Sequence, residues 1–300
     1  MGLEIRAEGL VMTYGDVRAV DGVSFTVAPG EFFGLLGPNG AGKTTILEMI
    51  EGLREPQAGT VRVGDHEPWR REPELQRRMG VQLQSSAFFE RLTAREQLDT
   101  FAALYGVAAG RTDEMLEQVG LVDKAATRTE DLSGGQKQRL SIACALIHDP
   151  DVVFLDEPTA ALDPQARRNL WDVLRTLNDS GRTVILTTHH MDEAEVLCDR
   201  VAIMDAGHVL ELDTPAALVR GLDAPVRISL APGTLSLDDA RSLAGDDPVV
   251  EEASSLTITT RDPSRVLTAL AQRDALAGLS VRGASLEDVF LELTGREYRA

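Results

Sequence analysis

The order of hydrophobic and polar positions predicts alternating strands and helices over the first two thirds of the 300-residue chain. Short apolar runs between turn residues are typical of buried strands, whereas apolar positions three or four residues apart are typical of helices. The predicted strands cover residues 3–13, 19–28, 32–36, 60–63, 152–155, 184–186 and 201–204, and the predicted helices cover residues 46–50, 164–179 and 191–199. This alternation favours a parallel sheet with helices on its faces.

A helical segment interrupts the alternation. Residues 91–128 change to a helical period. The apolar side chains expected on one face are Leu98, Phe101, Ala102 and Leu104. Thr93 followed by Glu96 matches a capping box, in which the two side chains satisfy each other's backbone N–H groups. We therefore expect a helical insertion over about residues 91–130, with a helix start marked by Thr93.

Beyond residue 221 the pattern changes again. Strand-like segments at 226–230, 248–260 and 279–281 alternate with helical segments at 236–244, at 263–273 and from Leu286 onward. We interpret this part as a small α+β unit of the split βαβ type. The apolar positions expected to form its core are Val226, Ile228, Leu256, Ile258, Val281, Val289 and Phe290. The chain is therefore expected to form two domains, residues 1–221 and 222–300, and only the first carries clustered chemistry.

Composition and charge exclude several classes of protein. The chain carries 48 acidic and 30 basic residues, a net charge of −18, which disfavours non-specific binding to nucleic acid or anionic lipid. No apolar run approaches the roughly 20 residues that span a bilayer, and the start of the chain does not resemble a signal peptide. We expect a cytosolic protein that docks on a membrane protein. Cys144 and Cys198 stand alone in apolar stretches and are interpreted as small core residues.

The strongest chemical signal is a glycine-rich stretch between a predicted strand and a predicted helix. It reads Gly37-Pro38-Asn39-Gly40-Ala41-Gly42-Lys43-Thr44 and is followed by Thr45. Glycines let successive backbone N–H groups turn toward one point, and the helix N-terminus adds the positive end of its dipole. In such a phosphate-binding loop the lysine reaches the terminal phosphates and the hydroxyl of Thr44 binds Mg²⁺. The alternative is a glycine turn that only caps an ordinary strand–helix unit.

Lysine usage favours the phosphate-binding interpretation. Of the 30 basic residues other than histidine, only Lys43, Lys124 and Lys137 are lysine. A lysine at the one position where a compact point charge suits the chemistry is therefore unlike the rest of the chain.

An acidic pair follows a second predicted strand. Asp156 and Glu157 come directly after the apolar run at 152–155. Ligands of open α/β sheets gather at the carboxyl ends of the strands, where Asp156 can meet a phosphate-bound Mg²⁺. Glu157 is placed to polarise a water molecule for attack on the γ-phosphate. A solvated acidic turn would be the alternative if the phosphate-binding loop were absent.

The segment Leu132-Ser133-Gly134-Gly135-Gln136-Lys137-Gln138-Arg139 resembles the signature motif of ATP-binding cassette (ABC) ATPases, and it lies just upstream of the acidic pair, as in that family. The resemblance covers residues 3–220. It implies an α/β P-loop NTPase of ABC type, in which a mostly parallel sheet carries an antiparallel β subdomain and the helical insertion. It also implies ATP and Mg²⁺ as ligands, with Ser133, Gly134, Gly135 and Gln136 contacting the nucleotide.

Other motifs of the family can be located one by one. Tyr14 resembles the aromatic residue that stacks on adenine, with a plain edge-strand aromatic as the alternative. Gln84 resembles the glutamine that reaches Mg²⁺ and the attacking water, although Gln82 could take this place. Asp163, in Ala161-Leu162-Asp163, resembles the loop that crosses to a partner subunit. His189 resembles the switch histidine at the γ-phosphate.

Two of these positions have further interpretations. His190 stands where the family usually has a bulky aromatic residue, and we interpret it as a surface substitution rather than a second catalytic histidine. Ser133 and the glycines after it also match a helix N-cap. That geometry presents backbone N–H groups to a phosphate, so the cap and the signature motif are compatible.

The resemblance implies a dimer. In the family, the signature loop of one subunit closes over the ATP held by the other, so one chain does not complete its own site. With one phosphate-binding loop and one signature motif, the chain is expected to pair with a second copy or with a paralogue.

The subgroup that the chain resembles most is the ATP-binding subunits of ABC-2 type exporters, in the daunorubicin and multidrug-resistance branch. The segments that carry this resemblance are residues 80–86, residues 187–195 and the ending Ser285 to Arg296. It implies an ATPase that works at the cytoplasmic face of the membrane with a separately encoded permease, and it leaves the transported compound open.

Three other classes compete with this interpretation. Soluble ABC ATPases of translation or DNA repair usually show two cassettes, zinc-binding cysteines or long coiled coils, and importer ATPases usually lack the ending. A nucleotide sensor without catalysis would have lost Lys43 or Glu157, and both are present. Lipid or polysaccharide export stays open as an alternative to export of drugs or antibiotics.

Overall fold

The computed structural model describes residues 2–82, 88–108, 110–160, 162–252 and 255–295. The chain forms two compact units, of which the first ends at Pro215 and the second begins at Ala216. Among the described residues, no helix combines the length and the apolar character that crossing a bilayer requires.

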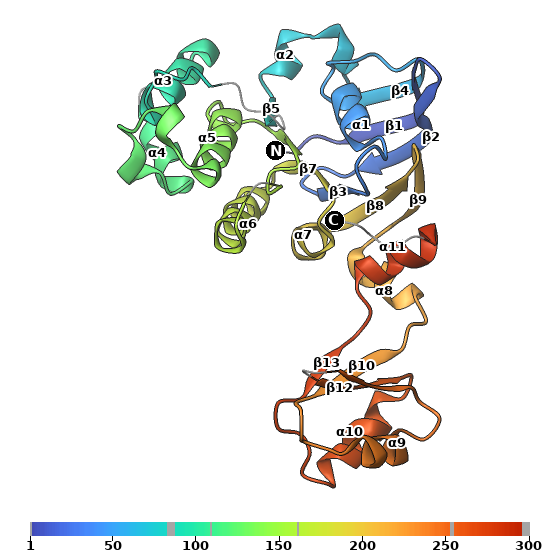
Figure 1. The fold of residues 1–300 in the computed structure, drawn as a ribbon. Coiled ribbons are helices and arrows are strands. Elements are labelled where there is room, and N and C mark those ends of the chain that lie inside the picture. Colours follow the sequence, from blue (N-terminus) through green and yellow to red (C-terminus); the bar gives the residue numbers. More distant parts are fainter. Residues whose placement is uncertain (1, 83–87, 109, 161, 253–254, 296–300) are drawn as a thin grey trace. The chain divides into compact units, whose positions relative to one another are not determined.

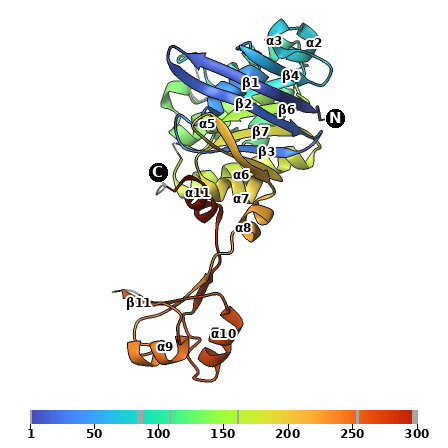
Figure 2. The same ribbon diagram turned by 90° about the vertical axis from the view of Figure 1, so that its right-hand side faces the viewer.

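The first unit contains two sheets (Figures 1 and 2). A three-stranded antiparallel sheet has the order β2 (Val17–Val27), β1 (Ile5–Tyr14), β4 (Ala58–Val63). A six-stranded sheet has the order β5 (Met79–Gln82), β6 (Val152–Asp156), β7 (Thr183–Thr188), β3 (Phe32–Leu36), β8 (Arg200–Asp205), β9 (His208–Asp213). Its strands are parallel except that β9 runs antiparallel to β8. The predicted mostly parallel sheet and antiparallel β subdomain are therefore confirmed.

Seven α-helices accompany these sheets in the described part of the first unit. They are α1 (Lys43–Ile50), α2 (Pro73–Gln76), α3 (Ala94–Tyr105), α4 (Arg111–Gln118), α5 (Gly134–Leu146), α6 (Pro164–Asp179) and α7 (Met191–Leu197). Short 3₁₀ helices at Pro68–Arg70, Val122–Lys124 and Thr129–Asp131 complete the connections.

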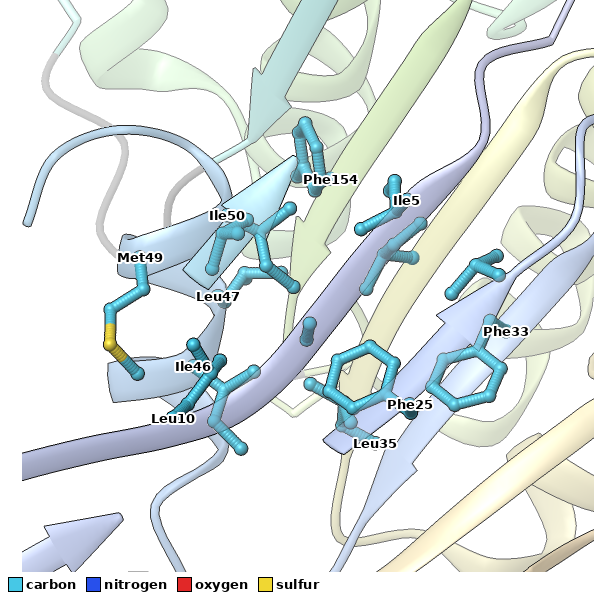
Figure 3. Close-up of a cluster of buried hydrophobic side chains, with 14 of the residues drawn as sticks. Ile5, Leu10, Phe25, Phe33, Leu35, Ile46, Leu47, Met49, Ile50 and Phe154 are labelled. Carbon is cyan, nitrogen blue, oxygen red and sulfur yellow. The ribbon is translucent and has the colours of Figure 1, made fainter. Parts of the chain in front are cut away.

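One hydrophobic core joins the two sheets and α1 (Figure 3). Leu10 comes from the antiparallel sheet and Leu35 from the six-stranded sheet, while Ile46 comes from α1, and all three are fully buried. The rings of Phe25 and Phe33 stack across the sheets with their centroids 5.2 Å apart. Burying a side chain of this size contributes about 1.5–3 kcal/mol. The core therefore fixes α1, and with it the loop that precedes this helix, against both sheets.

The helical insertion forms as α3 and α4, which pack with α5 (Figure 1). The predicted capping box is confirmed, because the Thr93 hydroxyl accepts from the backbone N–H of Glu96 and the Glu96 carboxylate accepts from that of Thr93. The placement of Leu104 on the buried face is wrong, since its side chain is 75% exposed, whereas Leu98 is fully buried. Six residues along a helix of 3.6 residues per turn place these two side chains on different faces.

The second unit is built around an antiparallel sheet with the order β11 (Val249–Glu252), β12 (Ser255–Thr260), β10 (Val226–Leu230), β13 (Ser280–Arg282). Its helices are α8 (Pro215–Gly221), α9 (Leu237–Ala244), α10 (Pro263–Ala271) and α11 (Leu286–Thr294). The strand order confirms the split βαβ arrangement, because β12 lies between β10 and β11, the two strands that α9 connects. The sheet packs on α9 and α10 through side chains such as Ile228 and Leu270. Val281 is 47% exposed on the short edge strand β13, so its expected place in the core is wrong.

Some short elements differ from the sequence-based expectation, whereas the two cysteines agree with it. The short strands β5 and β9 and the helix α2 were not predicted, and the segment at 248–260 contains two strands rather than one. Cys144 and Cys198 are buried free thiols, as expected, and burial raises the pKa of both.

Candidate active site

The ends of three neighbouring strands bring the predicted chemistry together. In the six-stranded sheet, β7 lies between β6 and β3, and all three run parallel. Their carboxyl ends therefore meet at one edge of the sheet, where ligands of open α/β sheets bind. Asp156 ends β6, Thr188 ends β7, and the glycine-rich loop follows Leu36 at the end of β3.

The glycine-rich loop needs its glycines at two points of close approach. Gly42 has φ 101°, and a Cβ atom there would lie 2.3 Å from the carbonyl oxygen of Ala19. A Cβ atom on Gly37 would lie 2.3 Å from the carbonyl oxygen of Met204. The backbone N–H of Gly37 donates to the carbonyl of Thr188, 3.3 Å away, which ties the start of the loop to the end of β7.

Lys43 is held inside this loop. Its side chain is 4% exposed, and Nζ donates to the carbonyl oxygens of Gly37 at 2.8 Å and Pro38 at 3.1 Å. Nζ also lies 3.5 Å from Oε1 of Glu157. Burial lowers the pKa of Lys43, and the charge of Glu157 partly offsets that effect. The chain thus directs a desolvated ammonium group toward the edge of the sheet.

Asp156 gathers hydroxyl groups from two other elements. Both of its carboxylate oxygens lie 3.3 Å from Oγ1 of Thr44 on α1, and Thr187 Oγ1 donates to Oδ1. Burial raises the pKa of Asp156, while these two hydroxyl groups act in the opposite direction. Carboxylate and hydroxyl oxygens next to a phosphate-binding loop are a donor set that suits Mg²⁺, which binds proteins through one or two carboxylates plus substrate phosphates. The residues therefore fit the predicted metal.

Glu157 is presented by a turn that L-amino acids rarely adopt. Its φ is 46°, in the left-handed region, and its backbone N–H donates to both the carbonyl oxygen and Oγ1 of Thr187, each at 3.1 Å. Its carboxylate oxygen Oε1 lies 3.5 Å from Lys43 Nζ and 3.3 Å from Nδ1 of His189. Strained backbone of this kind is common where a side chain must be aimed at a reacting group.

His189 and His190 follow the end of β7 directly. Their rings lie 4.2 Å apart between centroids, and His189 is the one that contacts Glu157. His190 is the N-cap residue of α7 and is half-buried, and its interpretation as a surface substitution rather than a second catalytic histidine stays a prediction. Burial lowers the pKa of His190, and the nearby charges of His189 and Arg167 lower it further.

Tyr14, Gln82 and Gln84 come from parts of the sequence other than the ends of β3, β6 and β7. Tyr14 ends β1, where it pairs with Val17 of β2, while the pairing of β1 with β4 ends at Val11, so the alternative of a plain edge-strand aromatic stays open. Its ring is 40% exposed, and the guanidinium carbon of Arg54 lies 5.0 Å from the ring centroid. Gln82 is fully buried in β5, and Gln84 lies outside the described residues.

The signature motif forms the start of a helix. Ser133 caps α5, since its hydroxyl accepts from the N–H of Gln136 at 3.3 Å and the Gln136 side chain accepts from the N–H of Ser133 at 3.0 Å. This confirms the expected N-cap. Asp163 caps α6, since its carboxylate accepts from the N–H groups of Gln165 and Ala166, while Ala161 lies outside the described residues. The contacts of Ser133, Gly134, Gly135, Gln136 and Asp163 with nucleotide stay predictions.

Sequence reasoning missed the residues that hold the site together. Thr187 contacts both Asp156 and Glu157, and Thr188 contacts Gly37 and the buried carboxylate of Glu193. The available signal was a pair of threonines at the end of a buried strand, directly before His189.

Comparisons with known proteins point to one family. Residues 20–160 match a family model described as ABC transporter. Nod factor export ATP-binding protein I of Paraburkholderia xenovorans (strain LB400) is 43% identical over 294 residues, which cover 95% of each chain. Linearmycin resistance ATP-binding protein LnrL of Bacillus subtilis (strain 168) is 37% identical over 309 residues, which cover 98% of this chain and 99% of that protein.

Solved structures are similar as well. The ATP binding subunit of an ABC transporter superposes with a TM-score of 0.67 at 25% identity and covers 97% of this chain and 99% of that one. The dimeric ATP-binding cassette MJ0796, in a post-hydrolysis state bound to ADP and Pi, has a TM-score of 0.63 at 27% identity and covers 70% of this chain and 98% of that one.

The chain belongs to the ATP-binding subunits of ABC transporters, and it is an ATPase. The fold predicted from the resemblance is confirmed. The predicted function, an ATP-hydrolysing subunit that powers an exporter, is confirmed at the level of the family by relatives that are themselves ATP-binding proteins of export and resistance systems.

Proposed function

We propose that this chain is the ATPase subunit of an ABC-2 type exporter and that it hydrolyses ATP at the edge of the six-stranded sheet. The observation that carries the proposal is the meeting of Lys43, Glu157 and His189, with contacts of 3.5 and 3.3 Å around one carboxylate oxygen. Asp156 and Thr44 lie at the same edge.

Each residue has a task that follows from its position. The backbone N–H groups of residues 37–45 and the start of α1 bind the phosphates, and Lys43 neutralises their charge. Glu157 accepts a proton from the attacking water, and His189 orients that carboxylate and the γ-phosphate. Tyr14 stacks on adenine. Thr44, Asp156 and Gln84 would hold Mg²⁺, which supplies charge stabilisation for the phosphate oxygens.

The complete site requires two chains. The proposal gives Ser133, Gly134, Gly135, Gln136 and Asp163 a role at the nucleotide of a partner subunit, as the resemblance implies. The dimeric cassette MJ0796 supports this arrangement, because that protein is a dimer with ADP and Pi bound. The partner is a second copy or a paralogue.

The proposed membrane partner is a separately encoded ABC-2 permease, which places the ATPase at the cytoplasmic face of the membrane. The relatives carry the names Nod factor export and linearmycin resistance. We therefore assign the exported compound to drugs, antibiotics or other hydrophobic compounds. Reconstitution of the ATPase with its permease in vesicles, followed by transport of such compounds, tests this part; ATP hydrolysis without any export would contradict it.

Replacing Glu157 by glutamine tests the site itself. This change removes the proton acceptor and keeps the shape of the side chain, so steady-state ATP hydrolysis should fall by about 10²–10⁴-fold while ATP binding is retained. Glu195, exposed on α7, provides a control in the form of Glu195→Gln, which should hydrolyse ATP normally. A rate for Glu157→Gln within about tenfold of the wild type would place the base elsewhere.

A further inference from the structure

Glu193 is a buried carboxylate next to the site that the proposed mechanism does not use. It lies on α7, four residues after His189, and its side chain is fully buried. Its Oε2 accepts from Oγ1 of Thr188 at 2.5 Å, and its Oε1 accepts from Nε1 of Trp171 at 3.2 Å. Taking a carboxylate out of water is costly unless the carboxylate is hydrogen-bonded, so a carboxylate at this buried position needs an explanation.

Thr188 connects this carboxylate to the glycine-rich loop and to the start of α7. Its carbonyl oxygen accepts from the N–H of Gly37, at the start of the phosphate-binding loop, over 3.3 Å. Its hydroxyl oxygen accepts from the N–H of His190 at 3.0 Å while donating to Glu193. His189 lies between Thr188 and His190, which these hydrogen bonds anchor. The Thr188 hydroxyl can make both bonds only in one orientation, and Glu193 sets that orientation.

Trp171 extends the connection to another helix. It lies on α6, the helix that Asp163 caps, and its indole N–H has Glu193 as acceptor. A single carboxylate thus joins the end of β7, the start of α7 and the middle of α6. Burial raises the pKa of Glu193, and the hydrogen bonds from Thr188 and Trp171 act in the opposite direction.

We infer that Glu193 is a positioning residue for ATP hydrolysis: through Thr188 it fixes the turn that holds His189 against Glu157. The inference rests on the proposed function, in which His189 and Glu157 act on the γ-phosphate and the water. Glu193 itself touches neither of those two side chains in any recorded contact among the described residues. A displacement of about 1 Å at a reacting group can reduce the rate by about 100-fold.

Steady-state ATP hydrolysis and calorimetric ADP binding by purified full-length variants test the inference. Glu193→Ala removes both acceptors, and Thr188→Val removes the hydroxyl group while keeping the side-chain shape. Each should lower kcat by roughly 10- to 100-fold and leave the ADP dissociation constant within about threefold. Glu193→Gln keeps one acceptor oxygen and should recover part of the loss. Glu195→Gln, on the same helix, should retain the wild-type rate.

A double-variant comparison separates positioning from general weakening of the fold. If Glu193 acts through His189, then Glu193→Ala should cause no further loss of kcat in a His189→Ala background, and neither should Thr188→Val. Equal losses in both backgrounds would overturn the inference, as would wild-type kcat in Glu193→Ala and Thr188→Val. Failure of the proposed function gives a different result, because Glu157→Gln would then hydrolyse ATP at a rate close to that of the wild type. Should Glu193→Ala not fold, Thr188→Val decides alone.

Discussion

Replacing Glu51 by glutamine should stabilise the protein at high pH and leave its stability near pH 4.5 almost unchanged. Glu51 follows α1, and among the described residues its buried Oε1 has no hydrogen-bond partner. Burial, together with the charges of Asp156 and Glu48, raises the pKa of this carboxyl from 4.5 to about 8. Arg71 and His148 line the same cavity as Glu51, but neither of them lowers the pKa of Glu51.

The sign follows from proton linkage. Because the folded state binds the Glu51 proton more tightly than the unfolded state, raising the pH from about 4.5 to about 8 weakens the folded state, and the effect is complete above pH 8. At about 1.4 kcal/mol for each unit of pKa, the full effect is at most about 5 kcal/mol. Glutamine carries no charge at any pH, so the variant avoids this loss.

Urea denaturation at pH 5, 7 and 9, without nucleotide or Mg²⁺, measures the difference. The two tryptophans, Trp69 and Trp171, both belong to the first unit, so their fluorescence follows the unfolding of the unit that contains Glu51. Glu55→Gln, at an exposed position four residues later, is the matched control and should show no pH-dependent gain. The reasoning is refuted if Glu51→Gln is no more stable than the wild type at pH 9, or if its gain is the same at pH 5.

Three further predictions concern the proposed site and the second unit. Lys43→Arg should impair ATP binding and hydrolysis nearly as much as Lys43→Ala, because Nζ is enclosed by loop carbonyls and the longer guanidinium does not fit there; normal turnover of Lys43→Arg would contradict this. Ser133→Arg should bind ATP but not hydrolyse it, and mixing it with Lys43→Ala chains should restore activity, since one site of the mixed dimer then carries neither change; a demonstrated mixed dimer without activity would count against closure by the partner. A chain that ends at residue 221 should still bind ATP but fail to support export with the permease, and full export without the second unit would exclude an accessory role.

The parts of the fold that repeat a clear periodic pattern could be predicted from the sequence. The strand at 152–155 and the glycine-rich loop were recognisable because apolar runs and fixed spacings carry them. β5 has only four residues. β9 is an edge strand in which apolar and acidic side chains alternate. Neither sequence therefore gives a strong local signal for a strand. Leu104 shows the reverse error, because its hydrophobic side chain predicts burial whereas its angle on the helix exposes it.

The residues of the site were predictable as a set of motifs, but their contacts were not. Sequence motifs identify Lys43, Glu157 and His189 separately, whereas the order of β6, β7 and β3 decides that they meet. That order depends on contacts between residues far apart in the chain, which no local pattern encodes. The supporting threonines are ordinary strand residues in the sequence, and their role depends on which strands lie on either side of β7.

The end of β7 also shows why two adjacent threonines are needed rather than one. Successive side chains of a strand point to opposite faces of the sheet. Thr187 therefore faces the side on which Asp156 accepts its hydroxyl group, and Thr188 faces the side on which α7 presents Glu193. One position cannot serve both faces, so Asp156 and the turn that carries His189 are supported by separate hydrogen bonds on a shared backbone. A shift of this strand end would then move Glu157, His189 and the phosphate-binding loop together, because Thr187 holds the N–H of Glu157 and Thr188 holds the N–H of Gly37. An ATPase needs coupled movement of this kind. Only then can ATP hydrolysis at the site alter the contacts that α6 and α7 make elsewhere.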